Sequence, residues 1–81
     1  MTLTRTDYNV LYRFGVDYAK NGNVEAVKGA ALYYVVATDS EKFSVRTEFE
    51  EGVRNHAGNQ PKVDRIMKNF DDWVAFHQTK D

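Results

Sequence analysis

The stretch GAALYYVV, residues 29–36, decides the fold of this chain. Its paired tyrosines and valines favour a strand, whereas the glycine and alanines before them suit close packing between helices. As part of a helix over residues 23–37, it would carry apolar side chains on nearly every side, which is typical of a central helix. As a strand, it would open a β-hairpin. The segments on either side help to decide between the two.

Residues 6–20 have the periodicity of an amphipathic helix. Charged residues occupy one side, and the apolar side contains Tyr8, Leu11, Tyr12, Phe14, Gly15, Tyr18 and Ala19. Thr6 or Asp7 can cap the start, and Gly22 can end the helix in the left-handed conformation. The sequence therefore predicts a helix before the contested stretch.

Residues 61–78 give the clearest helical pattern. One arc of the helix contains Val63, Ile66, Met67, Phe70, Trp73, Val74 and His77. Asn59 or Gln60 would be the N-cap, and Pro61 would stand near the first helical position, where a missing N–H costs nothing. This segment is predicted to be an amphipathic helix with one buried face.

The middle of the chain can be interpreted in two ways. As a hairpin at 31–50, it has a polar turn at residues 39–42 followed by strict alternation of apolar and polar side chains from residue 43. As two helices, it has Asn23 as the cap of the first and a capping-box spacing between Thr38 and Glu41 for the second. Arg46, Glu50 and Arg54 then repeat every four residues with alternating charge, a pattern of helix surfaces.

An internal repeat favours the helical interpretation. Three positions match at a constant offset of 36, pairing Ala30, Ala31 and Tyr34 with Ile66, Met67 and Phe70. Two packed helical hairpins are the simplest structure with this self-similarity. We therefore expect an all-α domain over residues 1–81, with four helices at about 6–20, 23–37, 40–56 and 61–78. The alternative is an α+β, α-β-β-α fold with a hairpin at 31–50.

Composition narrows the class of protein. The 81 residues can build one modest core, and a net charge of −1 gives no general attraction to nucleic acid or anionic membranes. There is no cysteine, so disulfides and thiolate metal sites are excluded, as is common in a reducing cytoplasm. No stretch approaches the roughly 18 apolar residues of a membrane span. We expect a soluble, cytoplasmic protein.

Motifs for catalysis and cofactor binding are missing from the sequence. The two serines are not in a nucleophile elbow, and the five glycines form no phosphate-binding loop. His56 and His77 are the only histidines, and neither belongs to a metal-binding motif. We expect no catalytic site, cofactor or metal, and therefore no enzyme.

The aromatic residues point to a function in binding. Tyrosine and tryptophan dominate the energetics of protein interfaces. Candidates for contact with a partner lie at the edges of the predicted stripes or off them: Tyr8, Tyr12, Tyr33 and Trp73. The sequence predicts a protein–protein interaction module, such as a small adaptor, regulator or inhibitor. An apolar face left uncovered would also allow a homodimer.

A basic cluster supports an alternative function. Lys62, Arg65 and Lys68 recur every third residue near the start of the last predicted helix, where helix N–H groups also attract anions. Asp64 and Asp72 interrupt the positive charge. The alternative is a small regulator that binds nucleic acid through these three side chains.

Overall fold

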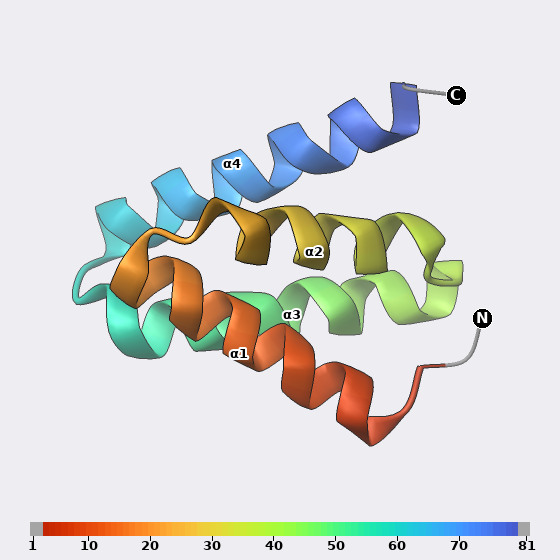
Figure 1. The fold of residues 1–81 in the computed structure, drawn as a ribbon, viewed down its shortest axis with the longest axis horizontal. Helices are drawn as coiled ribbons and strands as arrows, with labels where there is room; N and C mark the ends of the chain where they lie inside the picture. The colour runs from red at the N-terminus through yellow and green to blue at the C-terminus, as the bar shows by residue number, and fades with distance from the viewer. Residues whose placement is uncertain (1–2, 80–81) are drawn as a thin grey trace.

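The protein folds as four helices. The structure, a computed structural model, describes residues 3–79, and its helices are α1 (Arg5–Asn21), α2 (Val24–Val36), α3 (Asp39–Ala57) and α4 (Gln60–Thr79) (Figure 1). Within these residues there is no strand, so the all-α prediction is confirmed and the hairpin at 31–50 is wrong. Each helix boundary lies one residue from its predicted position.

The start of α1 corrects one predicted cap. Thr4, not Thr6 or Asp7, is the N-cap: its Oγ1 accepts the Asp7 N–H at 3.3 Å. In return the Asp7 carboxylate accepts the Thr4 N–H at 2.9 Å. Thr4 is preferred because Asp7 stands three residues beyond it, so both members of a capping box are present and both backbone donors are satisfied.

The other predicted helix ends are confirmed. Asn23 Oδ1 accepts the N–H of Glu25 at 3.1 Å, and the Glu41 carboxylate accepts the Thr38 N–H at 3.4 Å. Asn59 Oδ1 accepts a backbone N–H of the first turn of α4 at 2.9 Å. Gly22 and Gly58 follow α1 and α3 with φ of 66° and 90°, a region in which glycine is favoured because it has no Cβ.

The four helices form two antiparallel hairpins, α1–α2 and α3–α4, which we call the first and second hairpins. Both hairpin turns lie at one end of the molecule, and α2 lies between α1 and α4 in the view of Figure 1. α2 and α3 each contact all three other helices, so α2 shares the central position with α3. One side of α2 nevertheless remains uncovered, and this side becomes the candidate site below.

The two hairpins meet most closely where α1 crosses α3, with backbone against backbone. A Cβ on Gly15 would lie 2.2 Å from the Phe49 carbonyl oxygen, and a Cβ on Gly52 would lie 2.2 Å from that of Tyr12. Gly15 and Gly52 are 37 positions apart, as are Tyr12 and Phe49. The contacts are therefore reciprocal, as in an interface with two-fold symmetry.

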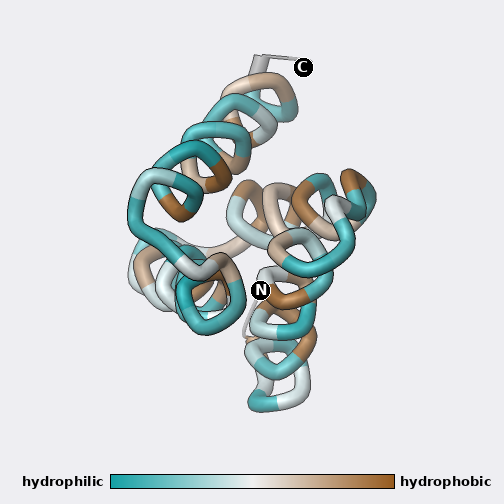
Figure 2. The backbone as a smooth tube through the Cα atoms, turned by 90° about the vertical axis from the view of Figure 1, so that its left-hand side faces the viewer, coloured by the Kyte–Doolittle hydropathy of each residue, from teal (hydrophilic) through white to brown (hydrophobic). Residues whose placement is uncertain are grey.

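The core lies between the hairpins and draws on all four helices. Its largest fully buried side chains are Phe49, Phe70, Leu11, Val27, Val45 and Val53. Phe70 stacks on Phe49 with ring centroids 5.1 Å apart and meets the edge of Tyr34 at 5.8 Å. The amphipathic character of α4 appears in Figure 2 as alternating hydrophilic and hydrophobic bands along the helix that ends at the C-terminus.

Candidate docking surface

A shallow apolar groove lies on the uncovered side of α2, against α1. We call it the α2 groove. It has a volume of about 430 Å³ and is lined by Phe14, Gly29, Leu32, Tyr33 and Val36. Leu32 is 48% exposed and Val36 is 52% exposed. These two residues are one helical turn apart, so they form a continuous apolar ridge beside the groove.

The floor of the α2 groove depends on a glycine. A Cβ at Gly29 would lie 3.0 Å from Cε2 of the Phe14 ring, so this ring occupies the space that a side chain at position 29 would need. The Phe14 ring also lies 6.4 Å from the Tyr33 ring, measured between centroids. Two aromatic rings, one from each helix, therefore form the side of the groove that faces α1.

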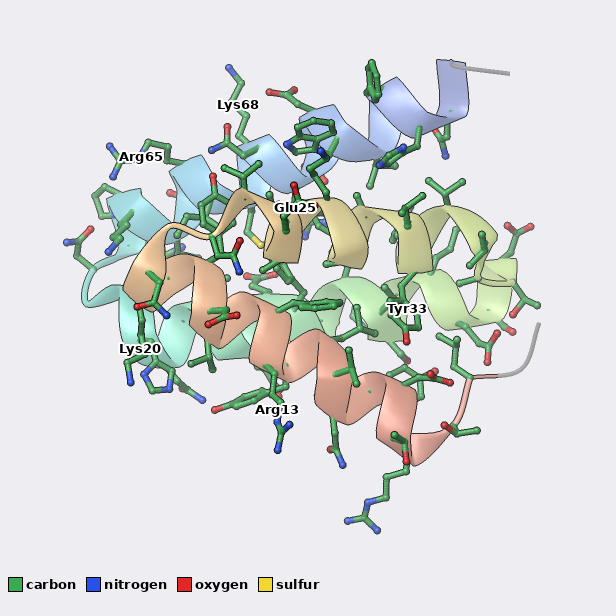
Figure 3. The ribbon with its side chains drawn as sticks, in the orientation of Figure 1. Arg13, Lys20, Glu25, Tyr33, Arg65 and Lys68 are labelled. Atoms are coloured by element: carbon green, nitrogen blue, oxygen red, sulfur yellow. The ribbon has the colours of Figure 1, made fainter. Side chains whose placement is uncertain are left out.

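A hydrogen bond holds Tyr33 at the edge of the groove. Its hydroxyl donates to Asp7 Oδ1 at 3.1 Å, and Tyr33 extends from α2 toward the first turn of α1 (Figure 3). The backbone N–H of Thr4, together with the hydroxyls of Tyr33 and Thr4, keeps the pKa of Asp7 below its usual value. Desolvation raises the pKa of Tyr33, as does its hydrogen bond to Asp7. At neutral pH the groove is therefore bordered by a carboxylate.

The equivalent surface of the second hairpin is charged. The repeat relates the residues of the α2 groove, at offsets of 37 for α1 and 36 for α2, to Glu51, Arg65, Lys68, Asn69 and Asp72. All of these except Asn69 are exposed. Arg65 and Lys68 project from α4 on the side away from α2 (Figure 3). The same positions of the fold are thus apolar in one half and charged in the other.

Ion pairs lie on part of the outer side of the second hairpin, which also has an exposed Phe43 and an apolar hollow of about 220 Å³ lined by Asp72, Trp73 and Phe76. Arg46 lies 3.5 Å from Glu50 and 3.2 Å from Asp71, and Arg54 pairs with Glu50 as well. Two hollows on this side, of about 270 and 350 Å³, are lined mainly by charged residues. Charged residues of this kind are typical of a solvent-exposed surface.

The four predicted contact residues do not form one surface. All four are half-buried, and Tyr8, Tyr33 and Trp73 pack against the core. The Tyr12 hydroxyl accepts a hydrogen bond from Asn55 Nδ2 at 2.9 Å, which ties it to α3. Trp73 lies on α4 beneath the ammonium of Lys28, 5.1 Å from the ring centroid. Of the four, Tyr33 alone lines the α2 groove.

The predicted basic cluster is divided. Lys62 Nζ donates to the Ala19 carbonyl at 3.2 Å and so caps the C-terminal end of α1. Arg65 and Lys68 are exposed, but Lys68 shares a hollow with Asp64 and Asp71. These contacts leave Arg65 and Lys68 exposed, with acidic groups beside Lys68, in place of three cations that act together.

Three apolar side chains that line the α2 groove, those of Phe14, Leu32 and Val36, were not among the predicted contact residues. Phe14 and Leu32 were assigned to apolar stripes or sides, and Val36 to a helix that was apolar all round. A comparison of the outer faces at the offset of 36, which sets Leu32 against Lys68 and Val36 against Asp72, would have found them.

Within residues 3–79, no three His, Cys, Asp or Glu side chains gather in a position to hold a metal ion. No helix in this range is both long enough and apolar enough to cross a membrane. Comparison of the chain with protein-family models, with curated proteins and with solved structures gives no match.

Proposed function

We propose that this protein is a non-enzymatic protein–protein interaction module, of the kind that serves as a small adaptor, regulator or inhibitor, and that it docks through the α2 groove. One observation carries the proposal. Positions that the fold treats as equivalent are apolar around α2, at Gly29, Leu32 and Val36, and charged around α4, at Arg65 and Lys68 among others.

The fold itself gives no reason for this difference. The outer side of α4 shows that a helix in this position can carry charged residues, which stay hydrated at no cost. Burying a valine or leucine side chain completely is worth about 1.5–3 kcal/mol. Because Leu32 and Val36 are half-exposed, a partner that covered them would recover about 1 kcal/mol from each. Binding to a partner accounts for their exposure.

The test uses three versions of the protein as bait for capture from the native host, read by quantitative mass spectrometry. The first is the unaltered chain. The second is Leu32→Lys/Val36→Thr, which places on α2 the lysine that α4 carries and a polar residue of valine's shape. The matched control is Arg65→Ala/Lys68→Ala, which alters the equivalent outer side of α4.

We expect a protein that both the unaltered chain and the control capture, and whose recovery falls at least tenfold with Leu32→Lys/Val36→Thr. Leu32 and Val36 are half-buried, so Leu32→Lys/Val36→Thr should lower the free energy of unfolding in urea by about 1–2 kcal/mol at most, while the exposed control should stay within about 0.5 kcal/mol of the original. A partner lost with the control but kept by Leu32→Lys/Val36→Thr would contradict the proposal. It would transfer the function to the basic residues of α4, and a steep salt dependence would then indicate nucleic acid.

A further inference from the structure

The size of the α2 groove limits what can occupy it. Five residues line it, whereas a stable interface takes about 20–30 residues and about 800 Å² from each partner. The second hairpin adds a smaller apolar hollow of about 220 Å³, lined by Asp72, Trp73 and Phe76, and the two hollows together have only eight lining residues. A second copy of the chain, docked here alone, would therefore fall short of a stable dimer. A short segment of another protein fits the size.

The backbone around the groove limits the conformation of that segment. Within residues 3–79 there is no strand, so an extended peptide would find no sheet edge to which its own N–H and C=O groups could bond. A helix brings its backbone hydrogen bonds with it and needs only side-chain contacts. Leu32 and Val36 form the i, i+4 ridge that packs into the surface of another helix. The groove is therefore suited to an amphipathic helix.

The charge at the edge of the groove limits the composition of that helix. Asp7 accepts the hydroxyl of Tyr33, which lines the groove, and pairs with no cation among the described residues. The basic side chains of Arg13 and Lys20 point away from α2, and Lys28 lies 3.6 Å from Glu25 (Figure 3). The Asp7 carboxylate accepts hydrogen bonds at the start of α1 but has no ion-pair partner within residues 3–79, so its negative charge beside the groove favours a cation on the partner.

From the size, the backbone and the charge together, we infer that the α2 groove binds a basic amphipathic helix of a partner protein, with apolar anchors on Leu32 and Val36 and a lysine or arginine beside Asp7. This inference rests on the proposed function and adds the chemistry of the partner to it. Asp7 and Tyr33 would select the charge of the helix, while the apolar ridge would supply most of the contact area.

The probe is a phage-displayed library of random 16-residue peptides, selected on the full chain. We expect enriched peptides with apolar residues at i, i+3 or i+4, and i+7 and with net positive charge. A synthetic member should become helical on binding, as seen by circular dichroism with the protein signal subtracted. Leu32→Lys/Val36→Thr should weaken its binding at least tenfold, and Arg65→Ala/Lys68→Ala should leave it unchanged.

The contact with Asp7 is tested by a cycle of two changes. Asp7→Asn should lower the affinity for the selected basic peptide about two- to fivefold, the size expected of an exposed ion pair. The affinity for a version of the peptide with glutamine in place of its lysine or arginine should not change. This comparison separates charge recognition from any loosening of the α1 capping box, because loosening would affect both peptides equally.

The remaining outcomes overturn the inference in distinguishable ways. Enriched peptides that are acidic or bind in an extended form, or an equal effect of Asp7→Asn on both peptides, would refute the basic helix and leave the proposed function standing. Binding that ignores Leu32→Lys/Val36→Thr would refute both. A dimer seen in analytical ultracentrifugation and dissociated by this variant would assign the groove to a second copy.

Discussion

The two hairpins of this protein meet in matching contacts on the inside and differ on the outside. Inside, Gly15 touches the backbone of α3 at the position that corresponds to the contact of Gly52 with α1. Outside, the first hairpin presents the apolar α2 groove, whereas the equivalent positions of the second hairpin carry exposed charged residues, such as Arg65 and Lys68. The close approach of two backbones constrains both halves equally. The outer surfaces carry no such constraint, so they are free to differ.

At the helix ends, side chains of the second hairpin cap helices of the first. Two lysines of the second hairpin, Lys42 and Lys62, donate to terminal carbonyl groups of α2 and α1. The Tyr34 carbonyl also accepts the N–H of Ala37 at 3.3 Å, so Lys42 adds a second donor there, whereas carbonyls of a last helical turn generally lack a partner within the helix. The first hairpin, which carries the proposed binding surface, is thus capped by the second.

The largest effect is expected at the glycine contact. Gly15→Ala and Gly52→Ala should each lower the free energy of unfolding by about 3 kcal/mol, because the added Cβ meets a backbone atom that cannot move alone. For a chain of this length that is a large part of a total of about 4–12 kcal/mol. Urea unfolding measures the loss. Clearly unequal losses would refute the equivalence of the two halves.

Gly29→Ala is the control for these two changes. Its Cβ would meet the Phe14 ring at 3.0 Å, and this ring can turn aside. The loss of stability should therefore be well below that at Gly15, and the main consequence should be a change in the shape of the α2 groove.

A smaller effect is expected at the capping lysines. Lys42 Nζ donates to the carbonyl groups of Tyr34 at 2.9 Å and Ala37 at 3.0 Å, whereas Lys62 Nζ donates to Ala19 at 3.2 Å. Lys42→Met should cost about 2 kcal/mol and Lys62→Met about 1 kcal/mol, since a charged donor is lost while methionine keeps the apolar stem. Hydrogen exchange should show the change first in the last turns of α2 and α1. Exchange that quickens only in α3 or α4 would argue against capping across the hairpins.

The smallest effect is expected at the capping carboxylates, one in each hairpin. The backbone N–H of Thr4 holds the pKa of Asp7 below its ordinary value of 3.8. The backbone N–H of Leu3 is the main cause that holds the pKa of Glu41 below its ordinary value of 4.5. A lowered pKa in the folded state means that the stabilisation is complete above the ordinary value and is lost as the pH falls through the lowered one. Unfolding measured from pH 6 down to pH 2 should therefore show stability falling below about pH 4.5. Asp7→Asn and Glu41→Gln should each flatten this fall, and carboxyl NMR titrations should place both midpoints below the ordinary values.

The sequence predicted the helices well because their ends are encoded locally. Asn23, Gly22 and the pair Thr38 and Glu41 act on neighbouring backbone groups, so a short window contains all the information required. The start of α1 was missed because Thr4 and Thr6 offer the same hydroxyl, and only the position of Asp7 three residues after Thr4 distinguishes them.

The candidate site was harder to predict because it depends on packing between distant segments. The stretch GAALYYVV reads as apolar on all sides, and periodicity does not say which side the other helices leave uncovered. Tyr33, which was predicted to lie off the buried stripe, lines the α2 groove but also packs against the core, and Leu32 was not among the predicted contact residues. Lys62 was grouped with Arg65 by spacing along the chain, although its ammonium reaches across to the end of α1.

The reciprocal crossing of α1 and α3 has a consequence for valency. Two separate copies of one hairpin, joined by the same glycine contact, would form a dimer with two identical outer faces. Because one continuous chain supplies both hairpins here, the face of the second is free to differ, and the molecule presents the α2 groove once. If the α2 groove binds a partner, this protein is a monovalent ligand: it covers a surface of one partner molecule and does not cross-link that molecule to a second one.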